Sequence, residues 1–152
     1  MASSPIEVVQ AFIAAINSRD PSQLAALMSE DHTFVDSAGT ACSGRELMTS
    51  GWADYYRMFP DYSIQIDTIL GEKDVVAAFG RASGTYNGKR GLVPENRIEM
   101  PAAWRAIVQA GKIRHWQVYA DWTEGVRIID EDRQSGQRPH ENGDERQHQD
   151  RR

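Results

Sequence analysis

The stretch Ser63-Ile64-Gln65-Ile66-Asp67-Thr68-Ile69 decides the fold class. Its polar and apolar side chains alternate, which is typical of a β-strand with one face in water. Residues 75–86 predict a second strand, which ends at Asn87-Gly88, the strongest short hairpin signal of the chain. Residues 97–109 and 113–123 complete a meander of four predicted strands.

Three helices are predicted before this meander. Ser4-Pro5-Ile6-Glu7 combines a capping serine, a proline in the first turn and the glutamate of a capping box. Asp20-Pro21-Ser22-Gln23 repeats this signal for a second, shorter helix, and Ser43-Gly44-Arg45-Glu46 begins a third, which Pro60 ends. Helices that are segregated from a largely antiparallel sheet predict an α+β domain.

Pro101 predicts the shape of the sheet. A proline inside a strand implies a bulge or a sheet edge, and therefore a bend. We expect a cone-shaped, strongly bent, mostly antiparallel sheet with about three helices packed on one face. The mouth of such a cone is a natural binding site.

Composition restricts the function classes. The 152 residues suit one domain, and 40% hydrophobic with 26% charged residues describe a soluble globular protein. A net charge of -5 argues against a general nucleic-acid binder, and no apolar run approaches the about 20 residues that span a bilayer. The N-terminus lacks a secretory signal pattern. We therefore expect a cytoplasmic protein with neither nucleic acid nor membrane as partner.

Few residues suggest a cofactor or a metal. Cys42 is the only cysteine, which excludes an internal disulfide and a thiolate metal cluster. No histidine base lies near it in the sequence, so we interpret it as a bystander. No glycine-rich phosphate loop follows a strand. We expect no cofactor and no metal.

The C-terminal residues differ from the rest. From Asp130 to Arg152 the chain has no aliphatic or aromatic side chain. Such a segment cannot offset its ordering entropy by burial. We therefore predict a domain over residues 1–127 and a disordered charged tail over residues 128–152. His140 and His148 lie in that tail, without further ligands at a spacing that suits a metal.

Asp36 is the first candidate functional residue. The stretch His32-Thr33-Phe34-Val35-Asp36-Ser37-Ala38-Gly39 predicts a short strand that ends in a polar turn. Phe34 and Asp36 share one face of this strand. In an apolar cone the carboxylate would be a usable general base near neutral pH. Two alternatives stay open, because Asp36 can instead cap its own turn through backbone amides or form an ion pair.

The order of elements resembles the nuclear transport factor 2-like superfamily, and within it the polyketide cyclase-like group called SnoaL-like. That superfamily includes ketosteroid isomerases, polyketide cyclases, epoxide hydrolases, dehydratases and non-catalytic binders, so the fold does not settle the chemistry. The resemblance implies a homodimer. The resembling pieces cover most of residues 5 to 124 and include residues 8–12, 17–20, 28–39, 43–46, 55–61 and 111–116.

The resemblance carries over two aspartates. Asp36 matches the general base of ketosteroid isomerase-like members. Asp121 follows Trp116 one residue later than the aspartate of cyclase-like members, and strict alternation along the strand points it outward unless a bulge intervenes. The oxyanion positions of the isomerases are held by Phe12 and Ala102, which cannot donate a side-chain hydrogen bond. This departure argues against a true ketosteroid isomerase.

The remaining site predictions concern the walls of the cone. His115 is a further catalytic candidate, although its neighbour Trp116 should point to the opposite face of the strand. Substrate contacts are expected from large apolar and aromatic side chains, which suggest a flat, apolar or polycyclic ligand. These residues are Phe12, Ile16, Phe34, Trp52, Tyr55, Tyr56, Phe59, Trp104, Trp116 and Tyr119.

The leading hypothesis is a cofactor-independent cyclase, isomerase or lyase that uses Asp36 on a hydrophobic substrate. The alternatives are a non-catalytic binder of a hydrophobic ligand and an interaction module of the same fold. A closed cavity with a buried Asp36 would favour the enzyme, whereas a cavity filled by Trp52 and Trp116 would favour the interaction module. A roomy cavity with Asp36 held in its own turn would favour the binder.

Overall fold

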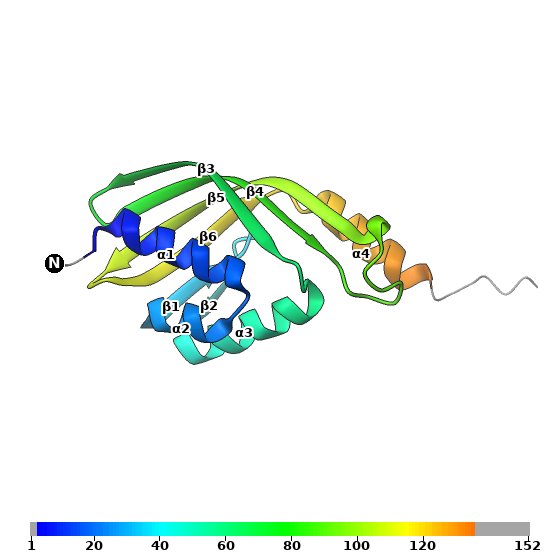
Figure 1. The fold of residues 1–152 in the computed structure, drawn as a ribbon, viewed down its shortest axis with the longest axis horizontal. Helices are drawn as coiled ribbons and strands as arrows, with labels where there is room; N and C mark the ends of the chain where they lie inside the picture. The colour runs from blue at the N-terminus through cyan, green and yellow to red at the C-terminus, as the bar shows by residue number, and fades with distance from the viewer. Residues whose placement is uncertain (1–2, 136–152) are drawn as a thin grey trace, which may run out of the picture.

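The computed structural model describes residues 3–135 and forms an α+β fold (Figure 1). Its elements follow the predicted order, with three additions: the short strand β2, the 3-10 helix η1 and the final helix α4. They are α1 (Pro5–Ser18), α2 (Pro21–Leu27), β1 (Met28–Val35), β2 (Ala41–Ser43), α3 (Arg45–Met58), β3 (Ser63–Glu72), β4 (Val75–Thr85), the 3-10 helix η1 (Pro94–Asn96), β5 (Arg97–Gln109), β6 (Lys112–Ala120) and α4 (Thr123–Ser135).

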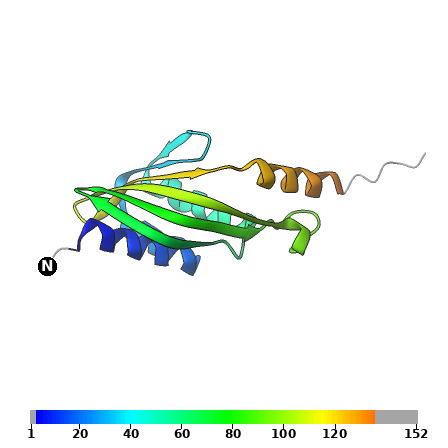
Figure 2. The same cartoon turned by 90° about the horizontal axis from the view of Figure 1, so that it is seen from above.

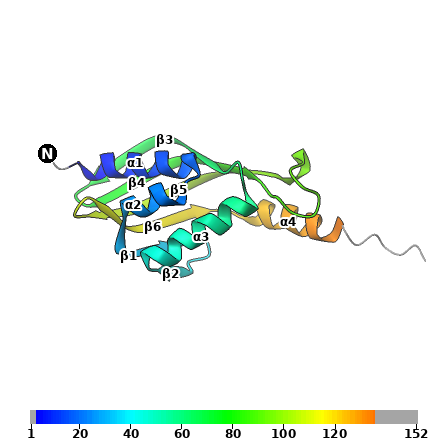
Figure 3. The same cartoon turned by 60° about the horizontal axis from the view of Figure 1, so that its bottom comes forward.

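The six strands form one curled sheet in the order β2-β1-β6-β5-β4-β3. All neighbours are antiparallel except β1 and β6, which pair in parallel. Helices α1, α2 and α3 lie on one face of this sheet, and α4 continues beyond its end (Figure 3). The predicted α+β class and the bent, mostly antiparallel sheet are confirmed.

The first helix begins where its capping signal predicts. The Ser4 hydroxyl accepts from the Glu7 amide at 3.2 Å, and the Glu7 carboxylate accepts from the Ser4 amide at 3.3 Å. Val9, Phe12 and Ile16 then lie on one stripe and are almost completely buried. The core therefore lies between α1 and the concave face of the sheet (Figure 2).

Pro101 lies at a sheet edge, which was one of its two predicted positions. The register of β4 and β5 runs without a break through the pair Arg81–Pro101. On the other side, the pairing of β5 with β6 begins only at Ala102–Ala120. Pro101 therefore lies just beyond the end of β6. The register irregularities of the sheet fall elsewhere: between Met28 and Thr33 in β1, between Ile66 and Thr68 in β3, and between Ile107 and Val108 in β5.

Helix α4 corrects two predictions. The last strand ends at Ala120 rather than at residue 123, because the Asp121 side chain accepts from the amide of Thr123, where a helix begins. Residues 128–135 belong to that helix, so the disordered tail predicted from residue 128 is wrong over this range. Residues 136–152, which contain His140 and His148, lie outside the described residues. Within residues 3–135, no helix is both long and apolar enough to cross a bilayer.

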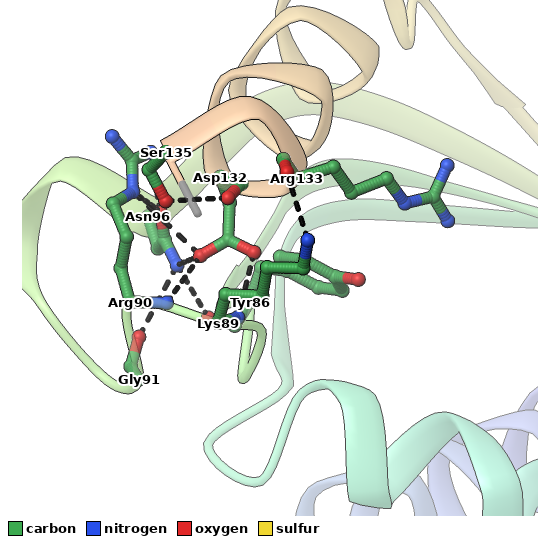
Figure 4. Close-up of polar contacts among 8 residues, drawn as sticks. All are labelled: Tyr86, Lys89, Arg90, Gly91, Asn96, Asp132, Arg133 and Ser135. Atoms are coloured by element: carbon green, nitrogen blue, oxygen red, sulfur yellow. Dashed lines mark hydrogen bonds and ion pairs between the residues drawn. The ribbon is translucent and has the colours of Figure 1, made fainter. Parts of the chain in front are cut away.

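A buried carboxylate fixes this helix to the loop between β4 and β5 (Figure 4). Asp132 is fully buried. Its Oδ1 accepts from the Lys89 amide at 2.8 Å, and its Oδ2 accepts from the Arg90 amide at 2.8 Å and the Asn96 side chain at 3.0 Å. The Arg90 guanidinium lies 3.6 Å from the same oxygen. The buried carboxylate is tolerated because hydrogen bonds from the loop between β4 and β5 satisfy both of its oxygens.

Candidate functional site

The concave side of the sheet holds a cavity of about 590 Å³, bounded by α3, β1 and the strands β4 to β6. Seven of its 21 lining residues are aromatic, and all four tryptophans of the chain are among them. The aromatic lining residues are Phe34, Trp52, Tyr55, Tyr62, Trp104, Trp116 and Trp122. A cavity of this size accepts a drug-sized ligand.

Strand and helix periodicity direct these side chains inward. Phe34 on β1, Trp104 on β5 and Trp116 on β6 lie on the concave face, and Phe34 pairs directly with Trp116. On α3, Met48, Trp52 and Tyr55 follow one another at helical spacing and face the same cavity.

The aromatic wall is tightly packed. Trp104 and Trp116 stack with ring centroids 6.4 Å apart and an interplanar angle of 23°. Tyr55 meets Tyr62 edge to face at 4.9 Å and 87°. Such pairs add to the stability gained from burial alone. We expect the wall to keep its shape when a ligand enters.

Asp36 lies at the mouth of the cavity and is held by its own turn. Its Oδ1 accepts from the amides of Ala38 and Thr40, both at 2.9 Å. The backbone closes the same turn, because the Gly39 amide donates to the Asp36 carbonyl at 2.9 Å. Within residues 3–135, Oδ2 has no hydrogen-bond partner on the protein, and the carboxylate forms no ion pair. The turn alternative for Asp36 is therefore observed, with one carboxylate oxygen left free.

The other two catalytic candidates do not line the cavity. Asp121 is exposed, and it accepts from the amide and the hydroxyl of Thr123 at 2.9 and 2.6 Å. These hydrogen bonds lower the pKa of Asp121. His115 lies on the opposite face of β6 from Trp116, and its Nε2 is 3.2 Å from the Gln117 side chain. No bulge brings Asp121 inward, because the strand has already ended.

Five of the ten predicted substrate contacts line the cavity, namely Phe34, Trp52, Tyr55, Trp104 and Trp116. The other five do not, for different reasons. Phe12 and Ile16 lie on the buried side of α1, in the core, and Phe59 packs against Tyr86 and Trp122. The Tyr56 hydroxyl donates to the Ile16 carbonyl at 2.8 Å, and Tyr119 is 48% exposed on the outer face of the sheet.

Several lining residues were not predicted from the sequence. Tyr62 follows the end of α3, and Met100 and Val118 occupy inward positions of β5 and β6 that alternation alone would have indicated. Trp122 precedes α4 and closes one side of the cavity. Its ring packs on Gly125, where a Cβ would lie 2.4 Å from Trp122 Cε3.

The buried titratable groups nearby are neutral. Burial raises the pKa of Tyr55 and of Tyr62 well above the usual range, so both phenols keep their protons. His32 is fully buried beside Phe12, and its Nδ1 lies 2.7 Å from the Ile113 carbonyl. Burial lowers the pKa of His32. Over residues 3–135, no three His, Cys, Asp or Glu side chains gather as a metal site requires.

Comparison with known proteins identifies the family. The family model of the SnoaL-like domain matches residues 9–116. The chain belongs to the SnoaL-like domain family. No curated protein matches this SnoaL-like domain at a significant level.

Solved structures share the fold of the SnoaL-like domain. A protein of Catenulispora acidiphila with a ketosteroid isomerase-like fold, in complex with trimethylamine, is 24% identical, with a TM-score of 0.70 over 80% of this chain and 91% of that one. A proposed polyketide cyclase of Xanthomonas campestris is 18% identical, with a TM-score of 0.73 over 82% and 96%. An LEH-like epoxide hydrolase of Mycobacterium tuberculosis is 15% identical, with a TM-score of 0.69 over 84% of this chain and 90% of that one. At these identities the likeness concerns the fold alone.

Proposed function

We propose that this SnoaL-like domain binds a hydrophobic small molecule in the cavity on its concave face. The observation that carries the proposal is a cavity of about 590 Å³ with all four tryptophans in its wall. Trp52 and Trp116 line this space and do not fill it. A filled cavity would instead have favoured the interaction module. Asp36 is held in its own turn, which favours binding over proton transfer.

Intrinsic fluorescence tests this proposal directly, because every tryptophan of the chain lies in the wall. A flat apolar ligand should quench or shift the emission in a saturable way. Native mass spectrometry of the purified protein should also detect whatever co-purifies. Ala120→Phe places bulk in the lining and should abolish saturable binding, whereas Ala14→Phe, on the exposed side of α1, should leave it intact. Equal binding by both variants would refute the proposal.

A second candidate is catalysis by Asp36 on the bound molecule, in a cyclase, isomerase or lyase reaction. The free Oδ2 of Asp36 supports it, because this oxygen belongs to a lining residue and is oriented by the two amides on Oδ1. General bases contribute roughly 10²- to 10⁴-fold to rates.

Asp36→Asn separates the two functions. Asparagine can still accept from both amides through Oδ1, so the turn and the shape of the cavity should persist. If Asp36 is the base, turnover of that molecule should fall at least about 100-fold. Unchanged turnover would remove Asp36 from the mechanism and leave the binding function.

We also propose a homodimer that forms through the outer face of the sheet. Phe79 and Tyr119 are 45% and 48% exposed, and they flank Ala103 in one row across β4, β5 and β6. Helices α1 to α3 all lie on the other face (Figure 3). Phe79→Glu should convert a dimer to a monomer in sedimentation velocity, whereas Leu92→Glu, at an exposed loop position, should not. A wild-type protein that stays monomeric at high concentration would contradict the dimer.

A further inference from the structure

The charges around the cavity are all of one sign. The lining contains two carboxylates, Asp36 and Asp54, and no lysine, arginine or histidine. Asp54 already has a cationic partner, because Arg57 lies one helical turn away and pairs with it. Asp36 has no such partner in the described part of the chain. One uncompensated negative charge therefore stands at the mouth.

The aromatic wall reinforces this preference. The faces of indole and phenol rings carry partial negative charge, and they attract cations that approach within about 6 Å of the ring centre. Seven aromatic residues line this cavity, and four of them are tryptophans, the best partners of this kind. An anionic ligand would meet neither a basic side chain nor a favourable ring face.

The free Oδ2 of Asp36 can contact a positively charged group of a ligand. Two backbone amides hold Oδ1 at 2.9 Å each and fix the carboxylate plane. Oδ2 can then accept from an ammonium N–H or lie against a quaternary ammonium. Charge-assisted contacts of this kind are stronger than neutral ones.

We propose that the natural ligand is an organic cation, an amine or quaternary ammonium whose apolar body lies among the tryptophans and whose charge lies beside Asp36. This proposal rests on the binding function proposed above and specifies its ligand class. In it, Asp36 is the counter-ion of the ligand.

The test uses three probes of one shape and three charges. Benzyltrimethylammonium, neopentylbenzene and phenylmethanesulfonate share a benzyl group and a tetrahedral head that is positive, neutral and negative, respectively. Tryptophan fluorescence titration should give an affinity for the cation about tenfold above that for the neutral probe, and no saturable response to the anion.

Variants identify the group responsible. Asp36→Asn should reduce the affinity for the cation about tenfold and leave the affinity for neopentylbenzene unchanged. Glu46→Gln is the control, and it should change cation binding less than twofold because Glu46 is exposed in the first turn of α3 and does not line the cavity. A melting temperature for each variant verifies that it is folded.

The failures are distinguishable. If the neutral probe or the anion binds as tightly as the cation, the charge preference is refuted and the hydrophobic pocket remains. If Asp36→Asn leaves cation binding unchanged, the counter-ion role is refuted. If none of the three probes gives a saturable response, both the cation proposal and the binding function fail.

Discussion

Replacing Asp132 with alanine should lower the free energy of unfolding by about 3 kcal/mol, because three donors, one of them on the buried Asn96, lose their acceptor at once. These donors are the amides of Lys89 and Arg90 and the side chain of Asn96 (Figure 4). Urea denaturation at neutral pH measures the effect. Asp130→Ala is the matched control, since Asp130 is exposed on the same helix, and we expect a change within about 0.5 kcal/mol.

The same carboxylate predicts an acid dependence. Burial opposes ionisation of Asp132, but hydrogen bonds from Asn96, Arg90 and Lys89 outweigh it and lower the pKa of Asp132. A lowered pKa in the folded state stabilises the protein above the unfolded value of about 3.9, and this contribution is lost as the pH falls through the folded value. The stabilities of wild type and Asp132→Ala should therefore converge in acid. A constant difference from pH 7 to pH 2 would contradict this account.

Gly80→Ala should be at least as damaging as the loss of Asp132. A Cβ at residue 80 would lie 1.8 Å from the Gln65 carbonyl oxygen and 2.9 Å from the Ile66 Cα, and both are backbone atoms that cannot rotate away. The close approach occurs where the register of β3 shifts, between Ile66 and Thr68. We expect a loss of about 3 kcal/mol or more, or failure to fold, as measured by circular dichroism and thermal unfolding.

Gly51→Ala is the control for this substitution. Gly51 lies inside α3, and a Cβ there would make only an ordinary contact, 3.9 Å from Met48 Cε. Alanine is about 0.5 to 1 kcal/mol better than glycine in a helix, so this variant should be at least as stable as the wild type. If Gly80→Ala unfolds at the wild-type temperature, the close approach of the β3 backbone to Gly80 is refuted.

Local signals are sufficient to predict most of this fold. The capping box at Ser4 and the alternation from Ser63 onward each depend on neighbours within a few residues. The hairpin predicted at Asn87-Gly88 is wrong, because β4 ends at Thr85 and a long connection with a turn between Gly88 and Gly91 leads to β5. The position of Asp36 at the end of its strand and the two competing roles for it also follow from such neighbours. Only the three-dimensional structure distinguishes these roles, because a turn acceptor and a pocket carboxylate have the same local sequence.

Helix α4 shows where local reasoning fails. Its charged composition is typical of a disordered tail. Among its buried residues, only Ile128 has a large apolar side chain. Its stability depends on partners about 40 residues earlier, at Lys89 and Asn96. The misassigned contacts Phe12, Ile16 and Phe59 have the same origin. The sequence identifies a buried aromatic stripe but not whether core or cavity lies beneath it.

The parallel pairing of β1 with β6 has a consequence for the order in which the chain assembles. His32 of β1 contacts the carbonyl of Ile113 near the start of β6, 81 residues later in the sequence. During synthesis, β1 and α3 therefore leave the ribosome long before the strand that completes their side of the sheet exists. Contacts of such large sequence separation slow folding, since the entropy of loop closure must be overcome first. Since Trp116, Val118 and Ala120 of β6 line the cavity, a nascent chain that stops before β6 lacks this part of its wall.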